Sequence, residues 1–135
     1  MKGRRPNEIT AGTATLTDAP KPPAWLSKDA KAEWRRVAPI LVERAVLTEA
    51  DLGILESYVV AIARVREAER TIARDGATIT NAKGEFKRHP AVTSQDAAIK
   101  TARLCANELG LTPVSRSRPT IRATSDEDDL SPLDI

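Results

Sequence analysis

Apolar residues recur at helical spacing over three stretches of this chain. The longest runs from Thr48 to Asp75 and contains no proline. Thr48 is a favoured N-cap with Asp51 three residues later, and Gly76 is a favoured residue just past a helix end. The pattern predicts one helix of about 26 residues, roughly 39 Å long at 1.5 Å per residue, which we call the spine. Its apolar face consists of Leu52, Leu55, Val59, Ile62, Val65 and Ile72.

A shorter helix is predicted ahead of the spine, from Ser27 as its N-cap to about Arg44–Ala45. Pro39 lies inside it and removes a backbone donor, so we expect a kink or break at Val37–Ala38. Because the link Val46–Leu47 is short, the two helices are expected to fold back on each other. The apolar face of this helix consists of Ala30, Trp34, Val37 and Leu41.

After the spine, the hydrophobic period changes from helical to extended. The runs Thr78–Thr80 and Glu85–Lys87 flank the turn Asn81–Gly84, which predicts a small β-hairpin. A third helix then opens at His89–Pro90, because proline suits a first turn, and it stops at Gly110. The predicted fold class is all-α: a helical hairpin with a long central helix, a small β-hairpin and a third helix, with flexible N- and C-terminal tails.

Composition divides the 135 residues into three parts. We predict a flexible basic and Pro-rich arm over 1–24, a helical core over 25–118, and an acidic C-terminal tail over 119–135. The net charge of +2 hides an asymmetry, because the last ten residues hold five acids and no base. Residues 1–125 therefore carry 21 basic against 14 acidic residues, a charge of +7. A basic body with an acidic tail indicates two different electrostatic partners, or a tail that shields the body.

Large core side chains are scarce in this sequence. The chain has four aromatic residues, so much of the apolar surface must come from Ala, Leu, Val and Ile. A small core of this kind is often supplemented by oligomerisation. Trp25 and Trp34 lie on or beside apolar stripes, so we predict that they are core or subunit anchors rather than base-stacking platforms.

Residues suited to catalysis are few. One histidine and one cysteine cannot form a Cys/His zinc site within one chain, and the Gly-x-x-x-x-Gly-Lys-Ser/Thr phosphate loop is absent. His89 precedes a helix and suits a cap better than a general base, while Cys105 suits a core or interface position. The acids Asp126–Asp129 suit a solvated or partner-docking tail better than a metal site. We predict no enzymatic activity, no catalytic residue, no metal, no cofactor and no small-molecule substrate.

Basic residues carry more information and form three groups. A basic arm either follows DNA phosphates or only solubilises the terminus. The face on the first helix either contacts DNA or is solvated. The stripe on the spine, at spacings of four, requires a counter-charge from a neighbouring subunit or a nucleic acid. The DNA-binding candidates are Lys2, Arg4 and Arg5 on the arm, Lys28, Lys31, Arg35 and Arg36 on the first helix, and Arg66, Arg70 and Arg74 on the spine.

Several short motifs, in order and spacing, resemble the small subunit of tailed-bacteriophage terminases. The resemblance covers roughly residues 2–118. Gly53 departs from it, because a better helix former is expected early in the spine, and the tail beyond Pro119 is not covered. The segments that carry the resemblance are Gly3–Pro6, Pro22–Ser27, Ala32–Pro39, Leu47–Asp51, Arg66–Glu69, His89–Pro90, Leu109–Pro113 and Ser115–Arg116.

The resemblance implies a non-catalytic viral DNA-packaging protein, in which residues 25–118 form the oligomerisation and DNA-binding core. Such small subunits form homo-oligomeric rings, recognise double-stranded viral DNA and regulate a large subunit that holds the ATPase and the nuclease. We expect the tail residues Leu130, Leu133 and Ile135, which are interleaved with acids, to dock onto the terminase large subunit. No signal peptide or long apolar run points to a membrane, so the expected location is the host cell cytoplasm.

Two alternatives remain from the sequence. A dimeric transcriptional regulator is the first, because the first two helices and their short link match a helix-turn-helix loosely. A scaffold that never touches DNA is the second. The number of subunits distinguishes a dimeric regulator from a ring, and a DNA titration across salt identifies the scaffold.

Overall fold

The computed structural model describes residues 15–117. The arm candidates Lys2, Arg4 and Arg5 and the docking candidates Leu130, Leu133 and Ile135 lie outside the described residues. The elements in chain order are α2 (Lys28–Glu43), the 3₁₀ turn η2 (Glu49–Asp51), α3 (Leu52–Asp75), β1 (Thr78–Thr80), β2 (Phe86–Arg88) and α4 (Pro90–Glu108). The predicted all-α class with one small β-hairpin is confirmed.

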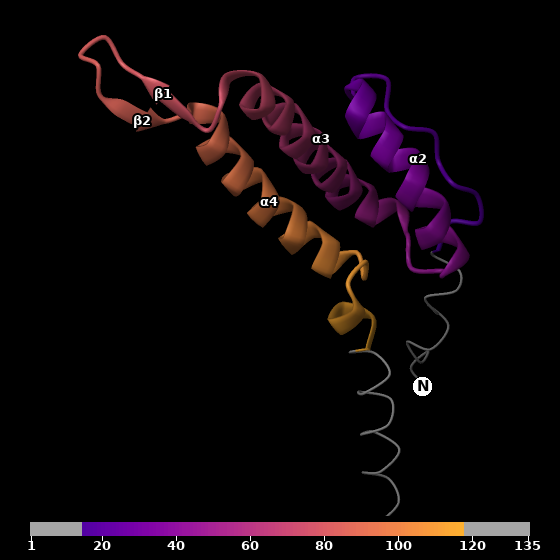
Figure 1. Ribbon diagram of the computed structural model, residues 1–135. Coiled ribbons are helices and arrows are strands. Elements are labelled where there is room, and N and C mark those ends of the chain that lie inside the picture. The colour runs from indigo at the N-terminus through magenta and orange to yellow at the C-terminus, as the bar shows by residue number, and fades with distance from the viewer. Residues whose placement is uncertain (1–14, 118–135) are drawn as a thin grey trace, which may run out of the picture.

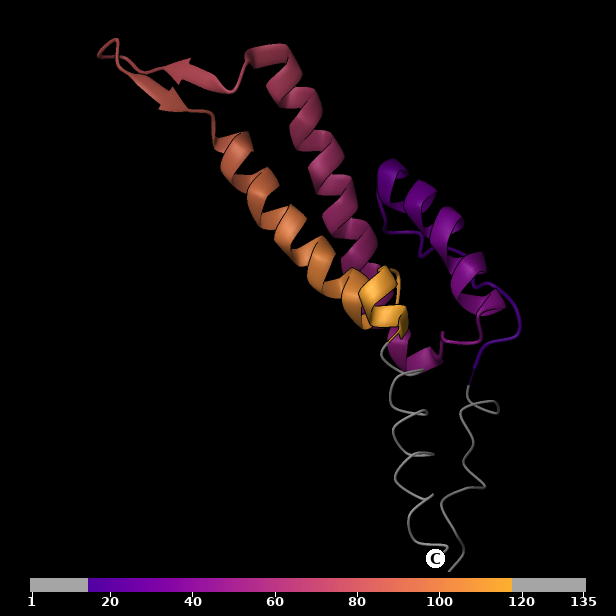
Figure 2. The ribbon, with the colours of Figure 1, turned by 60° about the horizontal axis from the view of Figure 1, so that its bottom comes forward.

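Helix α3 lies in the middle of the molecule, with α2 packed on one side and α4 on the other (Figures 1 and 2). The β-hairpin projects beyond the end of the α3–α4 pair (Figure 1). This position explains why α3 is buried on more than one face. Leu55, Tyr58 and Val59 belong to the core together with the small residues Ala61 and Ala63.

Helix α2 begins as the sequence predicts and ends one residue before the predicted stop. The hydroxyl of Ser27 accepts a hydrogen bond from the backbone N–H of Ala30 at 3.3 Å, which confirms Ser27 as the N-cap. A kink or break was expected at Val37–Ala38; the break is wrong, because α2 continues through Pro39 to Glu43, and the kink stays a prediction. Pro39 is exposed, so its ring points away from the core, while Val37 and Ala38 are buried. Tertiary packing therefore offsets the missing hydrogen bond.

The link between α2 and α3 reverses the chain in a few residues. Ala45 takes a left-handed conformation at φ 55°, which ends α2, and Leu47 is fully buried beneath the turn. Asp51 then accepts hydrogen bonds from the backbone N–H of Thr48 at 3.0 Å and from its hydroxyl at 2.8 Å. The predicted pairing of Thr48 with Asp51 is confirmed, although the first turn is 3₁₀ and not α-helical.

Residues 15–24 are attached to the helical body. The backbone N–H of Leu16 donates to the carbonyl of Leu47 at 2.8 Å, and the indole N–H of Trp34 donates to the carbonyl of Pro20 at 2.7 Å. The chain therefore joins the body before the boundary predicted at residue 24. Trp34 is buried as predicted, but Trp25 is 65% exposed, so a core role for Trp25 is wrong. The alternative role of Trp25 as a subunit anchor stays a prediction.

Helices α3 and α4 pack through small side chains. Ala68 on α3 and Ala98 and Ala102 on α4 are all buried, which lets the two backbones approach closely. Gln95 of α4 fixes their register, since its amide donates to the carboxylate of Glu69 at 2.7 Å. The α3–α4 pair is the most extensive contact between elements in the described chain.

The β-hairpin and α4 begin close to their predicted positions, with β2 one residue later than expected. Thr80 pairs with Phe86 in the antiparallel ladder, and Phe86 is 82% exposed. His89 confirms the predicted cap, because its Nδ1 atom accepts from the backbone N–H of Ala91 at 2.9 Å. Its Nε2 atom lies 3.1 Å from Asp75 Oδ2 and so ties the start of α4 to the end of α3.

Candidate nucleic-acid interface

Three basic residues form an open stripe on α2, which we call the basic stripe. Lys28, Lys31 and Arg35 follow each other at spacings of three and four residues, so they share one helical face. Lys28 and Arg35 are exposed and Lys31 is half-exposed. Within residues 15–117 no carboxylate lies within 4 Å of these three cations. Their charges are therefore available to an external anion.

The other basic candidate of α2 meets a buried acid. Glu33 is 2% exposed, although it lies between the apolar residues of α2. Arg36, one turn later, contacts both carboxylate oxygens of Glu33, from Nε and Nη2, at 2.7 Å each. Such a bidentate contact between arginine and a carboxylate is one of the strongest kinds of ion pair.

Two residues of α3 complete the environment of Glu33. Tyr58 donates its hydroxyl hydrogen bond to Oε2 at 2.7 Å, and Arg66 Nη2 lies 3.4 Å from Oε1. Every buried side-chain oxygen and nitrogen among the described residues has a hydrogen-bond partner. Glu33 therefore joins α2 to α3 through a satisfied polar cluster inside an apolar interface.

A second ion pair crosses the same interface nearer the start of α2. Arg70 Nη2 contacts Asp29 Oδ2 at 2.5 Å, and both groups reach solvent. We call this line of contacts between the two helices the α2–α3 seam. The seam consists of Asp29, Glu33, Arg36, Tyr58, Arg66 and Arg70.

The seam shifts the pKa values of its members. Burial acts to raise the pKa of Glu33, but hydrogen bonds from Arg36 and Tyr58 outweigh it, so this pKa lies below its usual value. Burial and then the hydrogen bond to Glu33 raise the pKa of Tyr58 to about 12. The hydrogen bond from Arg70 lowers the pKa of Asp29. Glu33 and Asp29 are therefore ionised at neutral pH, and Tyr58 is neutral.

The arginine stripe of α3 obtains its counter-charges within the chain. Arg66 and Arg70 face Glu33 and Asp29 of α2. Arg74 contacts its neighbour Asp75 at 2.8 Å, and hydrogen bonds from Arg74 and His89 lower the pKa of Asp75 to about 2. Each arginine of the stripe thus faces an acid of this chain, but Arg66 shares Glu33 with Arg36, so one positive charge stays unbalanced, and the side chains remain partly exposed.

The sequence patterns did not predict the role of the two acids of the seam, Asp29 and Glu33. A spacing rule compares residues on one helix, whereas Asp29 and Glu33 act on residues some thirty to forty positions away. One signal was available at Glu33. It is the only charged residue among Ala30, Trp34 and Val37 on the buried face of α2, and a buried acid requires partners.

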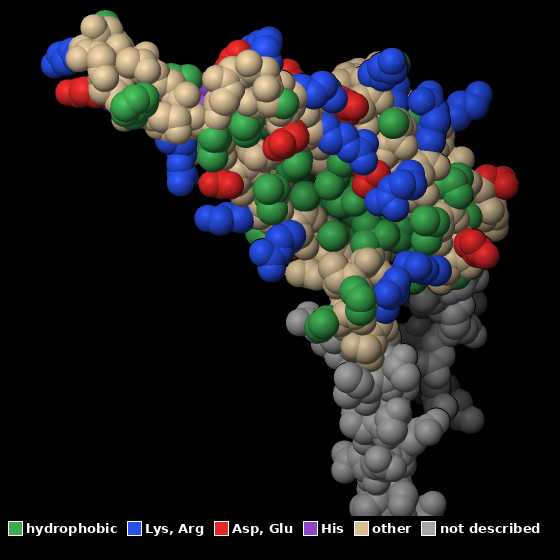
Figure 3. Space-filling view, in the orientation of Figure 1, with side chains coloured by type: hydrophobic (Ala, Val, Ile, Leu, Met, Phe, Trp, Pro, Cys, Tyr) green, Lys and Arg blue, Asp and Glu red, His purple; other side chains and the backbone are tan. Residues whose placement is uncertain are grey.

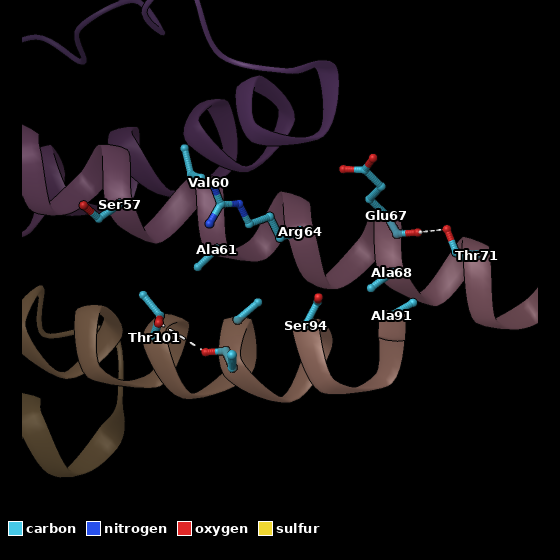
Figure 4. Close-up of a pocket in the computed structure, with 12 residues that line it drawn as sticks. Ser57, Val60, Ala61, Arg64, Glu67, Ala68, Thr71, Ala91, Ser94 and Thr101 are labelled. Atoms are coloured by element: carbon cyan, nitrogen blue, oxygen red, sulfur yellow. Dashed lines mark hydrogen bonds between the residues drawn. The ribbon is translucent and has the colours of Figure 1, made fainter. Parts of the chain in front are cut away.

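A groove of about 690 Å³ lies between α3 and α4. Figure 4 shows Ala61 and Ala68 of α3 pointing toward α4, and Ala91 and Ser94 of α4 pointing toward α3. Apolar side chains gather over this helix pair with Lys and Arg side chains around them (Figure 3). Small side chains at such a surface allow another helix to approach closely.

Side chains suited to metal binding are not gathered in the described chain. Over residues 15–117 no three His, Cys, Asp or Glu side chains are placed to hold a metal ion. Cys105 is half-buried, and burial raises the pKa of its thiol. In the same residues, no helix has both the length and the apolar character that crossing a membrane requires.

The fold and its surface thus define a small, mainly helical protein with an open basic stripe. A family model described as phage terminase, small subunit, matches residues 30–126. The chain belongs to this family, and its role lies in phage DNA packaging. Small terminase subunits are generally non-catalytic regulatory subunits, and the family implies DNA and the large subunit as partners in general. Neither the curated proteins nor the solved structures contain a match to the chain.

Proposed function

We propose that this protein is the DNA-recognition and regulatory subunit of a viral packaging motor, acting in the host cell cytoplasm. The observation that carries the proposal is the basic stripe of α2, whose three cations are exposed or half-exposed and have no acidic partner within residues 15–117. Lysine and arginine side chains of this kind bind DNA phosphates and release counterions. The family match supports DNA as the polyanion.

The test compares two charge-matched triple variants in a fluorescence anisotropy titration with double-stranded DNA across salt. Lys28→Gln/Lys31→Gln/Arg35→Gln removes the basic stripe. Its control, Lys83→Gln/Lys87→Gln/Lys100→Gln, removes three exposed charges from the hairpin and α4. The stripe variant is expected to lose at least tenfold in affinity. The slope of log affinity against log salt concentration is expected to become shallower by about 0.9 for each lost phosphate contact. Equal losses in both variants would refute a role specific to the stripe.

We propose further that the protein forms a homo-oligomeric ring through the α3–α4 pair. The groove, lined mostly by small side chains beside Arg64 and Glu67, and the apolar surface around it support this contact. A ring repeats the basic stripe around one DNA, so that weak contacts add up to avidity. Light scattering of Ser94→Arg, which places a long charged side chain in the groove, is expected to show smaller assemblies. Thr93→Arg, on the exposed neighbour outside the groove, is the control.

The acidic tail is proposed to dock onto the large subunit through Leu130, Leu133 and Ile135. The support is the family match together with the interleaving of acids and large aliphatic residues in this segment. Deleting residues 120–135 is expected to preserve the oligomer and the DNA affinity and to abolish stimulation of the large subunit's ATPase. Unchanged stimulation would exclude this segment as the docking motif.

A further inference from the structure

Two arginines from different helices meet at a single oxygen atom. Arg36 Nε of α2 lies 2.7 Å from Oε1 of Glu33, and Arg66 Nη2 of α3 lies 3.4 Å from the same oxygen. The two nitrogen atoms are therefore at most about 6.1 Å apart, which is the sum of these two distances. Like charges at this separation repel strongly unless an anion lies between them. Glu33 supplies that anion from a buried position.

Both guanidinium groups keep donors that Glu33 does not use. Arg36 directs Nε and Nη2 at Glu33, which leaves its Nη1 group, and Arg66 directs only Nη2. A guanidinium has five N–H donors, so each side chain retains several. Arg36 is 59% exposed and Arg66 is 43% exposed, so solvent and ligands reach these groups. Glu33 thus holds the guanidinium of Arg36 by two contacts and that of Arg66 by one, with the rest of both groups at the surface.

We propose that Arg36 and Arg66 bind one phosphate of the DNA backbone together, and that Glu33 is the positioning residue that builds this site. The proposal rests on the DNA binding proposed above. The planar fork of arginine matches the oxygens of a phosphate, and immobilised forks lose less entropy on binding.

The charges of the seam agree with a single phosphate. The seam contains two acids, Glu33 and Asp29, and three arginines, Arg36, Arg66 and Arg70. It therefore carries one excess positive charge. Lys and Arg side chains follow the border between α2 and α3 in the space-filling view (Figure 3). One backbone phosphate carries one negative charge and would balance this excess.

Glu33→Gln distinguishes two effects of Glu33 on DNA affinity. Glu33 positions the two arginines, which strengthens binding, and its charge repels the DNA phosphates, which weakens binding. The substitution removes an acid, so repulsion alone predicts tighter DNA binding. Loss of the anion that holds Arg36 and Arg66 predicts weaker binding, on the order of tenfold. Glu43→Gln is the matched control, since Glu43 is exposed on the same helix and makes no ion pair within residues 15–117. It is expected to leave binding unchanged or to tighten it slightly.

Two lysine variants test the proposed phosphate site even if Glu33→Gln fails to fold. Arg36→Lys and Arg66→Lys keep the charge but lose the fork, and both side chains are exposed enough to leave the helices intact. Each is expected to weaken binding several-fold without changing the salt slope, whereas Arg66→Ala should also lower the slope by about 1. Arg103→Lys, on an exposed position of α4, is the control and is expected to have no effect.

The readout is anisotropy of labelled double-stranded DNA at several salt concentrations, with circular dichroism as the check on folding. Weaker binding by both lysine variants, and by Glu33→Gln where it folds, with unchanged controls, supports the site. Binding by both lysine variants equal to that of the natural chain overturns it. In that case, loss of binding by the basic stripe variant shows that the proposed DNA-binding function still stands. If the natural chain itself fails to bind DNA, both proposals fall.

Discussion

Tyr58 on α3 donates its hydroxyl hydrogen bond to Oε2 of Glu33 on α2 at 2.7 Å, in the interior of the protein. Both residues are buried, whereas Arg36 and Arg66, the other partners of Glu33, reach solvent. The hydroxyl is therefore the donor that water can replace least easily. The contact between these two residues connects the stability of the core to the geometry of the surface arginines.

Tyr58→Phe is expected to lower the free energy of unfolding by about 1–2 kcal/mol, because a buried carboxylate loses one donor while the ring still fills its place. Urea unfolding at neutral pH measures this. Ser57→Ala is the control, since the hydroxyl of Ser57 is exposed and bonds only to the carbonyl of Gly53 in its own helix. The control is expected to stay within about 0.5 kcal/mol. Equal effects of the two substitutions would contradict the importance of the buried bond.

Acid is expected to weaken the fold through Glu33. Its pKa is lower in the folded protein than in the unfolded chain, so the folded state prefers the ionised carboxylate. The resulting stability is fully present above the unfolded pKa near 4.5 and is lost as the pH falls through the folded pKa. The stability difference between the natural chain and Glu33→Gln should therefore shrink between pH 6 and pH 3, which urea unfolding at each pH measures. A constant difference would contradict this linkage.

Pro39→Ala is expected to stabilise the protein. Pro39 lies inside α2, where it removes a hydrogen bond to the carbonyl of Arg35, and both residues are exposed. A proline in a helix interior costs about 3 kcal/mol relative to alanine, partly offset by about 1 kcal/mol from its restriction of the unfolded chain. A net gain of about 1–2 kcal/mol should appear as a higher Tm. A lower Tm would show that Pro39 makes a contact that alanine cannot replace.

The two tryptophans should behave in opposite ways. Trp34 is buried and bonded to Pro20, so Trp34→Ala is expected to cost about 3–5 kcal/mol. Trp25 is mostly exposed, so Trp25→Ala is expected to change monomer stability by less than about 0.5 kcal/mol. Iodide quenching of fluorescence in Trp34→Phe and Trp25→Phe reports the exposure of the remaining indole. Strong protection of Trp25 in the proposed oligomer would identify it as a subunit anchor.

Local rules were sufficient to predict the helix ends. Each of these helix ends is formed by residues within a few positions of one another. They are the cap at Ser27, the Thr48–Asp51 pair, Gly76 and the cap at His89. Capping geometry is decided by such neighbours, so the sequence contains it. The break expected near Pro39 was wrong because packing of α2 on α3, which a local rule does not contain, holds the helix together.

The seam could not be predicted from spacing on single helices. Arg36 was grouped with the first helix and Arg66 with the spine, yet the structure brings them to one carboxylate. The relevant register is that of α2 against α3, which depends on how Trp34 and Tyr58 pack in the core. The role of these arginines in DNA binding stays a prediction, and their shared acid was recognised only from its burial.

The attachment of residues 15–24 fixes where Thr15 lies relative to the basic stripe. Thr15 pairs with Thr48, next to the link that follows the C-terminal end of α2, whereas the basic stripe starts at Lys28 at the opposite end. Thr15 therefore lies at one end of a 16-residue helix, about 24 Å long, and the stripe begins at the other. If the chain at Thr15 and the start of the stripe contact the same duplex, their contacts are about seven base pairs apart at 3.4 Å each.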